Sequence, residues 1–314
     1  MTIIKKEKKG NGIQILTVAK DVDDEKMEKK MNTFLKREDI DTIIDYDADV
    51  YTEDGKLLLR FRKNVLPHEH VDAFYDNVIH FAKNKSGLRG SASGSKKKGY
   101  SDKKVMSNIF GYFDTWSPAQ KAVFKARGKT PAVTVRECRF NMDYPEKYKK
   151  TTTLIKDIDE LYAKLTPDHY KIQRKMANQT YFKIPGTSFT TVTTNVNYQT
   201  SVHQDVGDCI DGFGNLVVIE KSEGSESGKG YEGAETCFPQ YKIGVDVRTG
   251  DVLFMDVHEP HANLPMIKKD EDAIRLSIVC YLRTNVWLRT KNRTRRFYET
   301  HNRTVRNLRS IKAN

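Results

Sequence analysis

The sequence predicts an α+β protein built around a β-sandwich or jelly roll, with helices against one face of a double sheet. Helical spacing of apolar residues dominates the first half of the chain. From Tyr181 onward, short alternating segments are separated by turns that contain Gly or charged residues. Short strands at this spacing are typical of sandwiches and jelly rolls, and helices that precede them indicate an α+β arrangement.

The elements of the first half follow from turn residues and apolar spacing. Residues 1–45 are charged with weak periodicity, and we expect a poorly packed N-terminal extension there. An Asp54-Gly55 turn predicts a β-hairpin, and a helical period opening after Pro67 predicts a helix. The expected elements are a hairpin over 49–63, helices over 67–83, 118–127 and 148–165, and a strand over 132–140.

The second half is predicted to form a series of strands, and Thr249-Gly250-Asp251 is the sharpest turn between them. We expect one domain over residues 46–290, which includes a basic Gly/Ser/Lys loop over 83–104, and a basic C-terminal tail over 291–314. The expected strands cover 189–203, 214–220, 242–247, 251–257 and 275–283.

The net charge of +12 is concentrated in two segments. Residues 83–104 hold eight basic residues and one acidic residue, a net of +7, and residues 283–314 hold ten and one, a net of +9. The rest of the chain therefore has a net charge of −4. Two basic segments on a near-neutral body indicate a polyanionic partner, with nucleic acid as the obvious candidate. A solvated surface with a basic tail is the alternative, and the Gly/Ser/Lys mixture is typical of a mobile loop.

Composition excludes several other classes of protein. Four widely spaced cysteines form no Cys-x-x-Cys pair, which argues against a disulfide scaffold or a zinc module and fits a reducing compartment. No apolar run approaches the roughly 18–20 residues needed to span a membrane. The polar, basic start is not a secretory signal. We therefore expect an intracellular protein that is not secreted and has no membrane partner.

The residues that carry chemistry lie within the strand-rich half. His203 and Asp205 are two apart at the end of the expected strand over 189–203, so alternation points both the same way. His258 and His261 follow three strands later. Two histidines and one carboxylate form the facial triad that holds non-haem Fe(II) and leaves positions open. We expect His261 to be the third ligand, because the small residue Ala262 follows it and a small residue usually follows the distal histidine of such iron sites. His258 is kept as the alternative.

Arg275 opens another apolar strand, and Ser277 lies two residues further along on the same face. An arginine forms a fork to a carboxylate, and the serine adds a second hydrogen bond. Together with the iron ligands, this pattern predicts a 2-oxoglutarate-dependent oxygenase, in which Arg275 pairs with the distal carboxylate of the co-substrate and O2 reaches the metal. A cupin-like metal protein and a degenerate, metal-free relative are the alternatives.

The same stretches resemble a known family. The runs FTTVTTNVNYQTSVHQDVGDCIDGFGNLVVIE, TGDVLFMDVHEPHAN and RLSIVCYLR are similar to the TET/JBP family of nucleic-acid-modifying oxygenases, in a minimal microbial or viral form. The resemblance covers roughly Val133 to Arg283 well and the N-terminal third loosely. It implies a double-stranded β-helix that uses Fe(II), 2-oxoglutarate and O2. It also implies oxidation of the 5-methyl group of a pyrimidine in DNA, 5-methylcytosine or thymine, to the 5-hydroxymethyl base.

The resemblance assigns roles to residues of this chain. Asp208 matches a position that contacts the target base, and Asn195 and Asn197 lie on the strand that leads into the metal site. A purely structural interpretation, in which these two asparagines pair polar groups between strands, is equally favoured. The sequence departs mildly from the family in reading His-Ala-Asn where many relatives have His-Gly-Asn, and it lacks the Cys-rich zinc region of animal members. The expected site is His203, Asp205 and His261 for iron, Arg275, Ser277 and Asn197 for the co-substrate, and Asp208 and Asn195 for the base.

Two other functions remain open. One is a protein or small-molecule hydroxylase on the same fold, which would leave the basic segments without a role. The other is a DNA-binding relative that has lost catalysis, against which the intact ligand set argues. We expect a monomer with no obligatory protein partner, and the sequence does not choose between thymine and 5-methylcytosine.

Overall fold

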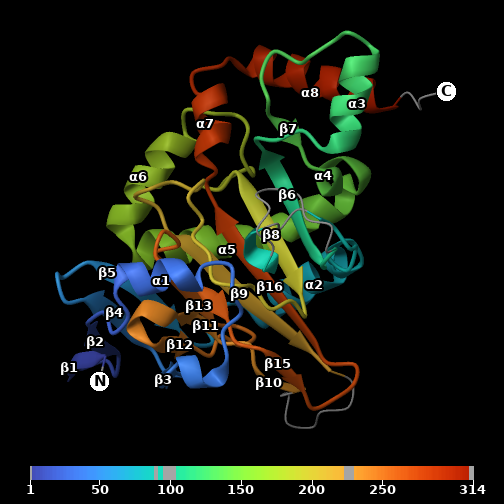
Figure 1. Cartoon of the computed structure of the whole chain (residues 1–314). Helices are drawn as coiled ribbons and strands as arrows, with labels where there is room; N and C mark the ends of the chain where they lie inside the picture. The colour runs from blue at the N-terminus through green and yellow to red at the C-terminus, as the bar shows by residue number, and fades with distance from the viewer. Residues whose placement is uncertain (1, 88–90, 95–103, 223–229, 311–314) are drawn as a thin grey trace.

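The computed structural model describes residues 2–87, 91–94, 104–222 and 230–310 (Figure 1). Its largest layer is a ten-stranded sheet in which sequence-distant strands are neighbours, so that β16 lies between β9 and β8. In spatial order, its strands are β1 (Ile3–Lys8), β2 (Gln14–Val18), β4 (Ala48–Thr52), β5 (Leu57–Arg62), β13 (Val252–Met255), β9 (Gly214–Lys221), β16 (Ile274–Tyr281), β8 (Thr191–Val196), β6 (Ser107–Phe113) and β7 (Arg136–Glu137).

Two smaller sheets complete the strand layers. The four-stranded sheet is ordered β14 (Ala262–Asn263), β11 (Thr236–Phe238), β12 (Ile243–Val245) and β3 (Thr42–Ile44). The other is an antiparallel pair formed by β10 (Tyr231–Gly233) and β15 (Met266–Lys268). The four-stranded sheet faces the large one, and their apolar side chains form a shared core between them.

Helices lie on the other face of the large sheet and at one of its ends. Helices α2 and α5 pack on each other and against the sheet, whereas α3 and α8 contact each other near the end of β6 (Figure 1). None of the helices among the described residues is both long and apolar enough to cross a membrane. The helices are α1 (Asp24–Lys30), α2 (His68–Ala82), α3 (Pro118–Ala126), α4 (Arg139–Asp143), α5 (Pro145–Leu165), α6 (Pro167–Ala177), α7 (Thr284–Thr290) and α8 (Arg295–Ser310), with short 3-10 turns η1 (Arg37–Asp39), η2 (Ser91–Ser93) and η3 (Pro239–Tyr241).

Strand alternation divides the apolar residues of the large sheet between two cores. On β16, Leu276 and Ile278 face the core under α2 and α5, whereas Val279 packs against the core between the sheets. The helices contribute their own apolar stripes, such as Val71 and Phe74 of α2. The expected α+β jelly roll with helices against one face is confirmed, as are the hairpin at Gly55 and the helices now labelled α2, α3 and α5.

The expectation of a poorly packed extension over residues 1–45 is wrong. Strand β2 pairs in parallel with β4 and buries Leu16 and Val18 completely. Helix α1 buries Met27 in a small cluster with Val202. The segment looks weakly periodic because β1 carries exposed Lys and Glu at most positions, as edge strands often do.

The expected basic tail over 291–314 is also corrected, because α8 is part of the fold. Val305 and Leu308 are buried against Trp116 and Phe124. The side chain of His301 contacts the carbonyl of Val135 through Nε2 at 2.7 Å. The apolar stripe of α8 is narrow and its other positions are mostly charged or polar, so composition suggested a solvated tail.

The strand expected over 132–140 is mostly absent, and only Arg136–Glu137 pairs with β6. The side chain of Asn141 on α4 accepts a hydrogen bond from the amide of Gly111 at 2.9 Å and donates one to its carbonyl at 3.2 Å. The amide of Cys138 also donates to the Gly111 carbonyl at 2.9 Å, so the chain stays bonded to β6 up to the start of α4. It then turns into α4 directly after Cys138.

Prediction: Leu16→Ala lowers the free energy of unfolding by about 2–5 kcal/mol, because it leaves a cavity in the core between the sheets. Urea denaturation measures the change. The matched control is Ile4→Ala on β1, where the side chain is 56% exposed and the effect is expected to stay within about 0.5 kcal/mol. Equal, small effects at both positions would show that the N-terminal segment does not contribute to the core.

Candidate metal centre and neighbouring anion site

His203, Asp205 and His261 converge on one point. Their nitrogen and oxygen ligand atoms all lie within 4.8 Å of one another. The Nε2 atoms of His203 and His261 lie 3.9 and 3.8 Å from the two carboxylate oxygens of Asp205. Both imidazoles are buried, and the Asp205 side chain is a quarter exposed. Such a cluster opens to solvent on the carboxylate side and can hold a metal ion.

Backbone hydrogen bonds bring the two histidines together. The amide of His203 donates to the carbonyl of His261 at 3.0 Å, and the amide of His261 donates back at 2.9 Å. The amide of Asp205 continues this pairing with the carbonyl of Val257 at 2.9 Å. Directly opposed residues of an antiparallel pair point to the same face, so both imidazoles face Asp205.

This geometry differs from the predicted one. The strand expected over 189–203 ends at Val196, and Asn197 adopts a left-handed conformation with φ of 45°. His203 therefore lies on an isolated bridge to His261, outside any regular strand. Strand alternation correctly predicted that His203 and Asp205 lie close together, but for an incomplete reason. Backbone pairing between the segment around His203 and the segment around His261, and not the periodicity of a strand, holds the two residues in place.

Each histidine is oriented by a carbonyl two residues before it. Nδ1 of His203 lies 2.7 Å from the carbonyl oxygen of Ser201, and Nδ1 of His261 lies 2.9 Å from that of Glu259. A carbonyl only accepts, so each Nδ1 carries a proton, and each Nε2 faces Asp205. Two imidazoles that offer Nε2, together with one carboxylate, match the donor set of a non-haem Fe(II) site.

His258 lies outside the cluster and holds the turn that precedes His261. Its Nδ1 is 3.2 Å from Asp256, whose carboxylate also accepts from Lys56 at 2.6 Å. The hydrogen bond to Asp256 raises the pKa of His258, with burial acting in the opposite direction. Burial alone would raise the pKa of Asp256, but the hydrogen bonds from His258 and Lys56 outweigh it and lower the pKa to about 2.

Arg275 is a buried cation near the start of β16. It is 4% exposed and pairs in register with Glu220 on β9. The carboxylate of Glu220 is occupied by Arg248 at 2.8 Å and by the amide of Thr249 at 3.1 Å. Within the described part of the chain, no carboxylate pairs with the Arg275 guanidinium. Since an uncompensated buried charge is costly, the site fits an anionic ligand.

Asn195, Asn197 and Ser277 form hydrogen bonds between β16 and the neighbouring segments. The Asn195 amide donates to Ser277 at 3.3 Å and accepts from Ser107 at 2.6 Å. The Asn197 side chain accepts from the backbone amide of Arg275 at 2.7 Å and donates to the carbonyl of Ala273 at 3.0 Å. Both asparagines therefore pair the strands on either side of the cation.

Asp208 is buried and faces Arg283, a residue that the sequence analysis did not single out. Arg283 Nη1 lies 3.5 Å from the Asp208 carboxylate, and Arg283 Nε donates to Asp114 at 3.0 Å. A Cβ on Gly207 would lie 2.0 Å from Arg283 Nη1, so a larger residue there would displace the Arg283 guanidinium. Arg283 ends the strand run 275–283, which is the signal that sequence reasoning had available.

The described part of the basic loop lies against the segment that leads into His203. The amide of Ser201 donates to the carbonyl of Ala92 at 2.9 Å, and the amide of Gly94 donates to the Ser201 hydroxyl at 3.1 Å. Tyr198 also donates to the carbonyl of Ala92. Residues 91–94 are thus fixed beside the metal cluster, whereas residues 88–90 and 95–103, on which the expectation of a mobile loop also rested, lie outside the described residues.

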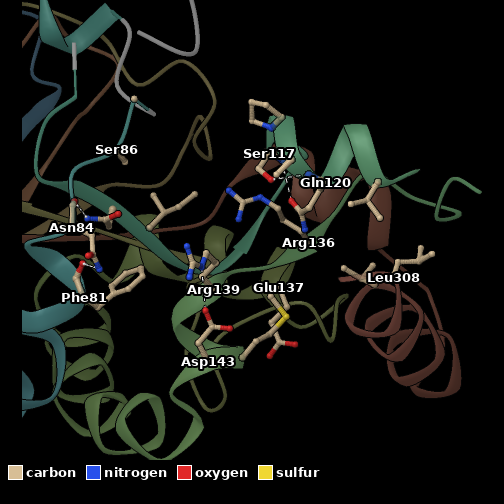
Figure 2. A pocket seen from close by; sticks show the side chains of 18 of the residues that line it. Phe81, Asn84, Ser86, Ser117, Gln120, Arg136, Glu137, Arg139, Asp143 and Leu308 are labelled. Carbon is tan, nitrogen blue, oxygen red and sulfur yellow. Dashed lines mark hydrogen bonds and ion pairs between the residues drawn. The ribbon is translucent and has the colours of Figure 1, made fainter. Parts of the chain in front are cut away.

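A large cavity of about 840 Å³ lies elsewhere, between α2, β6, α3, α4 and α8 (Figure 2). Arg136, Glu137, Arg139 and Asp143 line it; Arg139 pairs with Asp143 at 3.1 Å, and Glu137 pairs at 2.5 Å with Arg306, which lies outside the lining. No residue of the metal cluster lines this cavity. We therefore base the function on the cluster and not on the cavity.

Prediction: Asp256→Asn lowers the free energy of unfolding by about 2 kcal/mol between roughly pH 4 and pH 6.5. The stabilisation from a lowered carboxylate pKa is present above its ordinary value of 3.8 and is lost as the pH falls through about 2. The contribution of His258, whose pKa is raised, is full below 6.5 and fades at higher pH. Urea unfolding across pH measures this, and a constant difference between wild type and variant from pH 2 to 8 would contradict it.

Comparisons with known proteins match this chain to a described family. Residues 122–284 match the Tet_JBP family, described as the oxygenase domain of the 2OGFeDO superfamily. This range is more than half of the chain and contains the metal cluster and Arg275. NgTET1, solved in complex with 5mC DNA, shares the fold with a TM-score of 0.52 and 14% identity, over 91% of this chain and 90% of that one.

Two curated relatives are proteins much longer than this chain. The bifunctional helicase and thymine dioxygenase JBP2 of Leishmania braziliensis is 30% identical over 210 residues, which are 67% of this chain and 17% of that protein. The thymine dioxygenase JBP1 of Crithidia fasciculata is 25% identical over 251 residues, 79% of this chain and 28% of that protein. The chain thus spans only a minor part of these relatives. With its family match over the residues that form the metal cluster, the chain belongs to the Tet_JBP family of 2-oxoglutarate- and Fe(II)-dependent oxygenase domains.

Proposed function

We propose that this chain hydroxylates the 5-methyl group of a pyrimidine in DNA, giving the 5-hydroxymethyl base. The observation that carries the proposal is the cluster of His203, Asp205 and His261, in which both Nδ1 atoms are tied to carbonyls. Family membership and the thymine dioxygenase activity named for two relatives support it.

Each part of the site has a task in this reaction. His203, Asp205 and His261 hold Fe(II) through Nε2 and carboxylate oxygens, and the carbonyls of Ser201 and Glu259 keep the imidazoles in the required tautomer. Arg275 pairs with the distal carboxylate of 2-oxoglutarate, and the Ser277 hydroxyl lies on the same face to add a hydrogen bond. When bound, Fe(II), 2-oxoglutarate and O2 supply the oxidising chemistry.

DNA as substrate accounts for the basic segments. Lys and Arg side chains that replace counterions on phosphates supply affinity without regard to sequence. Residues 91–94, an uncharged Ser-Ala-Ser-Gly stretch within the basic segment of the sequence, are hydrogen-bonded to Ser201, two residues before His203. A base within a duplex cannot reach a metal held inside a protein, so the target nucleotide is extruded, at a cost of a few kcal/mol.

Asp208 and Arg283 are the proposed contacts for the extruded base. The carboxylate of Asp208 is an acceptor, and Arg283 presents donors beside it at 3.5 Å. The acceptor suits the exocyclic amine of 5-methylcytosine or the ring N–H of thymine. Asn195 and Asn197 act in our proposal by holding β8 and β16 in register, because their amides bond those strands. A compartment that contains DNA and a monomeric state stay predictions.

Prediction: His261→Ala abolishes tight Fe(II) binding and DNA-dependent succinate release, whereas His258→Ala retains both. The reason is that His261 Nε2 faces Asp205, whereas His258 Nδ1 faces Asp256. Anaerobic metal titration and a succinate assay measure the two properties, and circular dichroism checks that each variant is folded. Loss of metal with His258→Ala and retention with His261→Ala would reverse the assignment.

Prediction: incubation of the purified chain with Fe(II), 2-oxoglutarate and duplex DNA yields 5-hydroxymethylcytosine or 5-hydroxymethyluracil, detected by nucleoside mass spectrometry. Duplexes with and without 5-methylcytosine separate the two bases. Asp205→Ala is the matched control and yields neither product, because it removes one of the three proposed iron ligands. DNA binding without succinate formation would favour a silent relative, and DNA-independent oxidation of a peptide would favour a protein hydroxylase.

A further inference from the structure

Two buried polar groups next to the large sheet have no polar partner within the described part of the chain. One is the guanidinium of Arg275, which is 4% exposed. The other is the hydroxyl of Tyr231, whose side chain is 1% exposed and whose oxygen makes no hydrogen bond. A buried hydroxyl left unpaired is rare and destabilising, so it calls for an explanation.

Tyr231 is held firmly in place at the first residue of β10. Its backbone pairs with Lys268 on β15, and its carbonyl accepts a hydrogen bond from Arg248 Nη1 at 3.4 Å. The guanidinium of Arg248 also lies over the Tyr231 ring, 4.5 Å from its centre. The ring therefore has little freedom to turn its hydroxyl toward another partner.

A chain of contacts connects Tyr231 to Arg275. Arg248, which stacks on Tyr231, bonds Glu220 at 2.8 Å, and Glu220 lies directly opposite Arg275 in the register of β9 and β16. Residues opposed in an antiparallel pair point to the same face. Tyr231, Arg248, Glu220 and Arg275 thus form one cluster on the face of the large sheet that also carries Ser277.

The charges within this cluster are unequally compensated. Arg248 bonds both Asp246 at 2.6 Å and Glu220 at 2.8 Å, so its charge is neutralised. Glu220 is thereby held by Arg248, and no carboxylate of the described ranges pairs with Arg275. Burial raises the pKa of Tyr231 to about 12, and the charge of Arg275 is the largest effect that opposes the rise. The phenol is consequently protonated at neutral pH and is available as a donor.

We propose that the Tyr231 hydroxyl donates a hydrogen bond to the distal carboxylate of 2-oxoglutarate, the same group that pairs with Arg275. This inference rests on the proposed function, because it needs 2-oxoglutarate at Arg275. A carboxylate between the two groups would satisfy both: it compensates the guanidinium, and one of its oxygens accepts from the phenol. Tyr231 is then a binding residue for the co-substrate, supplied by a strand outside the large sheet.

The test compares two ligands in two variants. Fe(II)-loaded protein, kept anaerobic, is titrated with 2-oxoglutarate or with 2-oxobutyrate, which has the keto acid end but no distal carboxylate. Isothermal titration calorimetry gives each Kd. Tyr231→Phe is expected to weaken 2-oxoglutarate binding roughly tenfold to a hundredfold, the range for one hydrogen bond to a charged group, and to leave 2-oxobutyrate binding unchanged.

Tyr112→Phe is the matched control, since Tyr112 is another buried tyrosine and lies at the opposite end of β6 from Ser107, the strand partner of Asn195. It should leave the affinity for both ligands unchanged. The melting temperature of Tyr231→Phe without 2-oxoglutarate should not fall, because the lost hydroxyl has no partner there. In turnover, the variant should raise KM for 2-oxoglutarate with kcat nearly unchanged.

The outcomes separate the inference from the proposed function. Unchanged 2-oxoglutarate affinity in Tyr231→Phe, together with a loss in Arg275→Ala, overturns the role of Tyr231 and leaves the proposed function intact. Equal weakening of both ligands in Tyr231→Phe also overturns it, because the effect would not involve the distal carboxylate. Failure of the wild-type protein to bind 2-oxoglutarate overturns both.

Discussion

The metal cluster depends on the pair of backbone hydrogen bonds between His203 and His261. Neither histidine lies on a long strand, and the nearest element, β14, begins one residue after His261. The two reciprocal bonds, at 3.0 and 2.9 Å, nevertheless impose the geometry of a sheet on two distant segments of the chain. The local arrangement is the same on both sides, since each Nδ1 contacts the carbonyl two residues before it. The positions of both Nε2 atoms are therefore set by the backbone, which keeps the site preorganised before any ligand binds.

A second constraint is the distribution of charge next to β16. The large sheet could have neutralised Arg275 with Glu220, its directly opposed neighbour. Instead, Arg248 and Thr249 occupy both oxygens of Glu220. Among the residues that the structure describes, Arg275 is thus a buried cation with no carboxylate paired to it, at a cost that the apolar cores on the two faces of the sheet offset. The anion site that we propose at Arg275 rests on this diversion of Glu220, and the hydroxyl of Tyr231, which has no hydrogen-bond partner among the described residues, lies in the same cluster.

The residues of the metal cluster and several of the helices could be predicted from the sequence, but the way in which these elements pack together could not. His203, Asp205 and His261 could be found because residue type and order suffice for a facial triad. The end of β8 could not, because it depends on Asn197 taking a left-handed conformation and bonding Arg275. The expected strand over 132–140 is reduced to Arg136–Glu137 and is followed by α4, whose Asn141 bonds the distant strand β6, a contact that the local pattern does not show. Tyr231 lay outside every pattern, since only its unpaired hydroxyl distinguishes it from other buried tyrosines.

The folded helix α8, found where a basic tail was expected, changes how the proposed DNA substrate would be held. Charges on a disordered tail must be ordered on binding, which costs conformational entropy. Helix α8 is fixed by Val305 and Leu308, so its exposed arginines, such as Arg296 and Arg303, are held in position by the fold. Phosphate contacts from such prepositioned groups retain more of their binding free energy, and extrusion of the target base draws on that free energy.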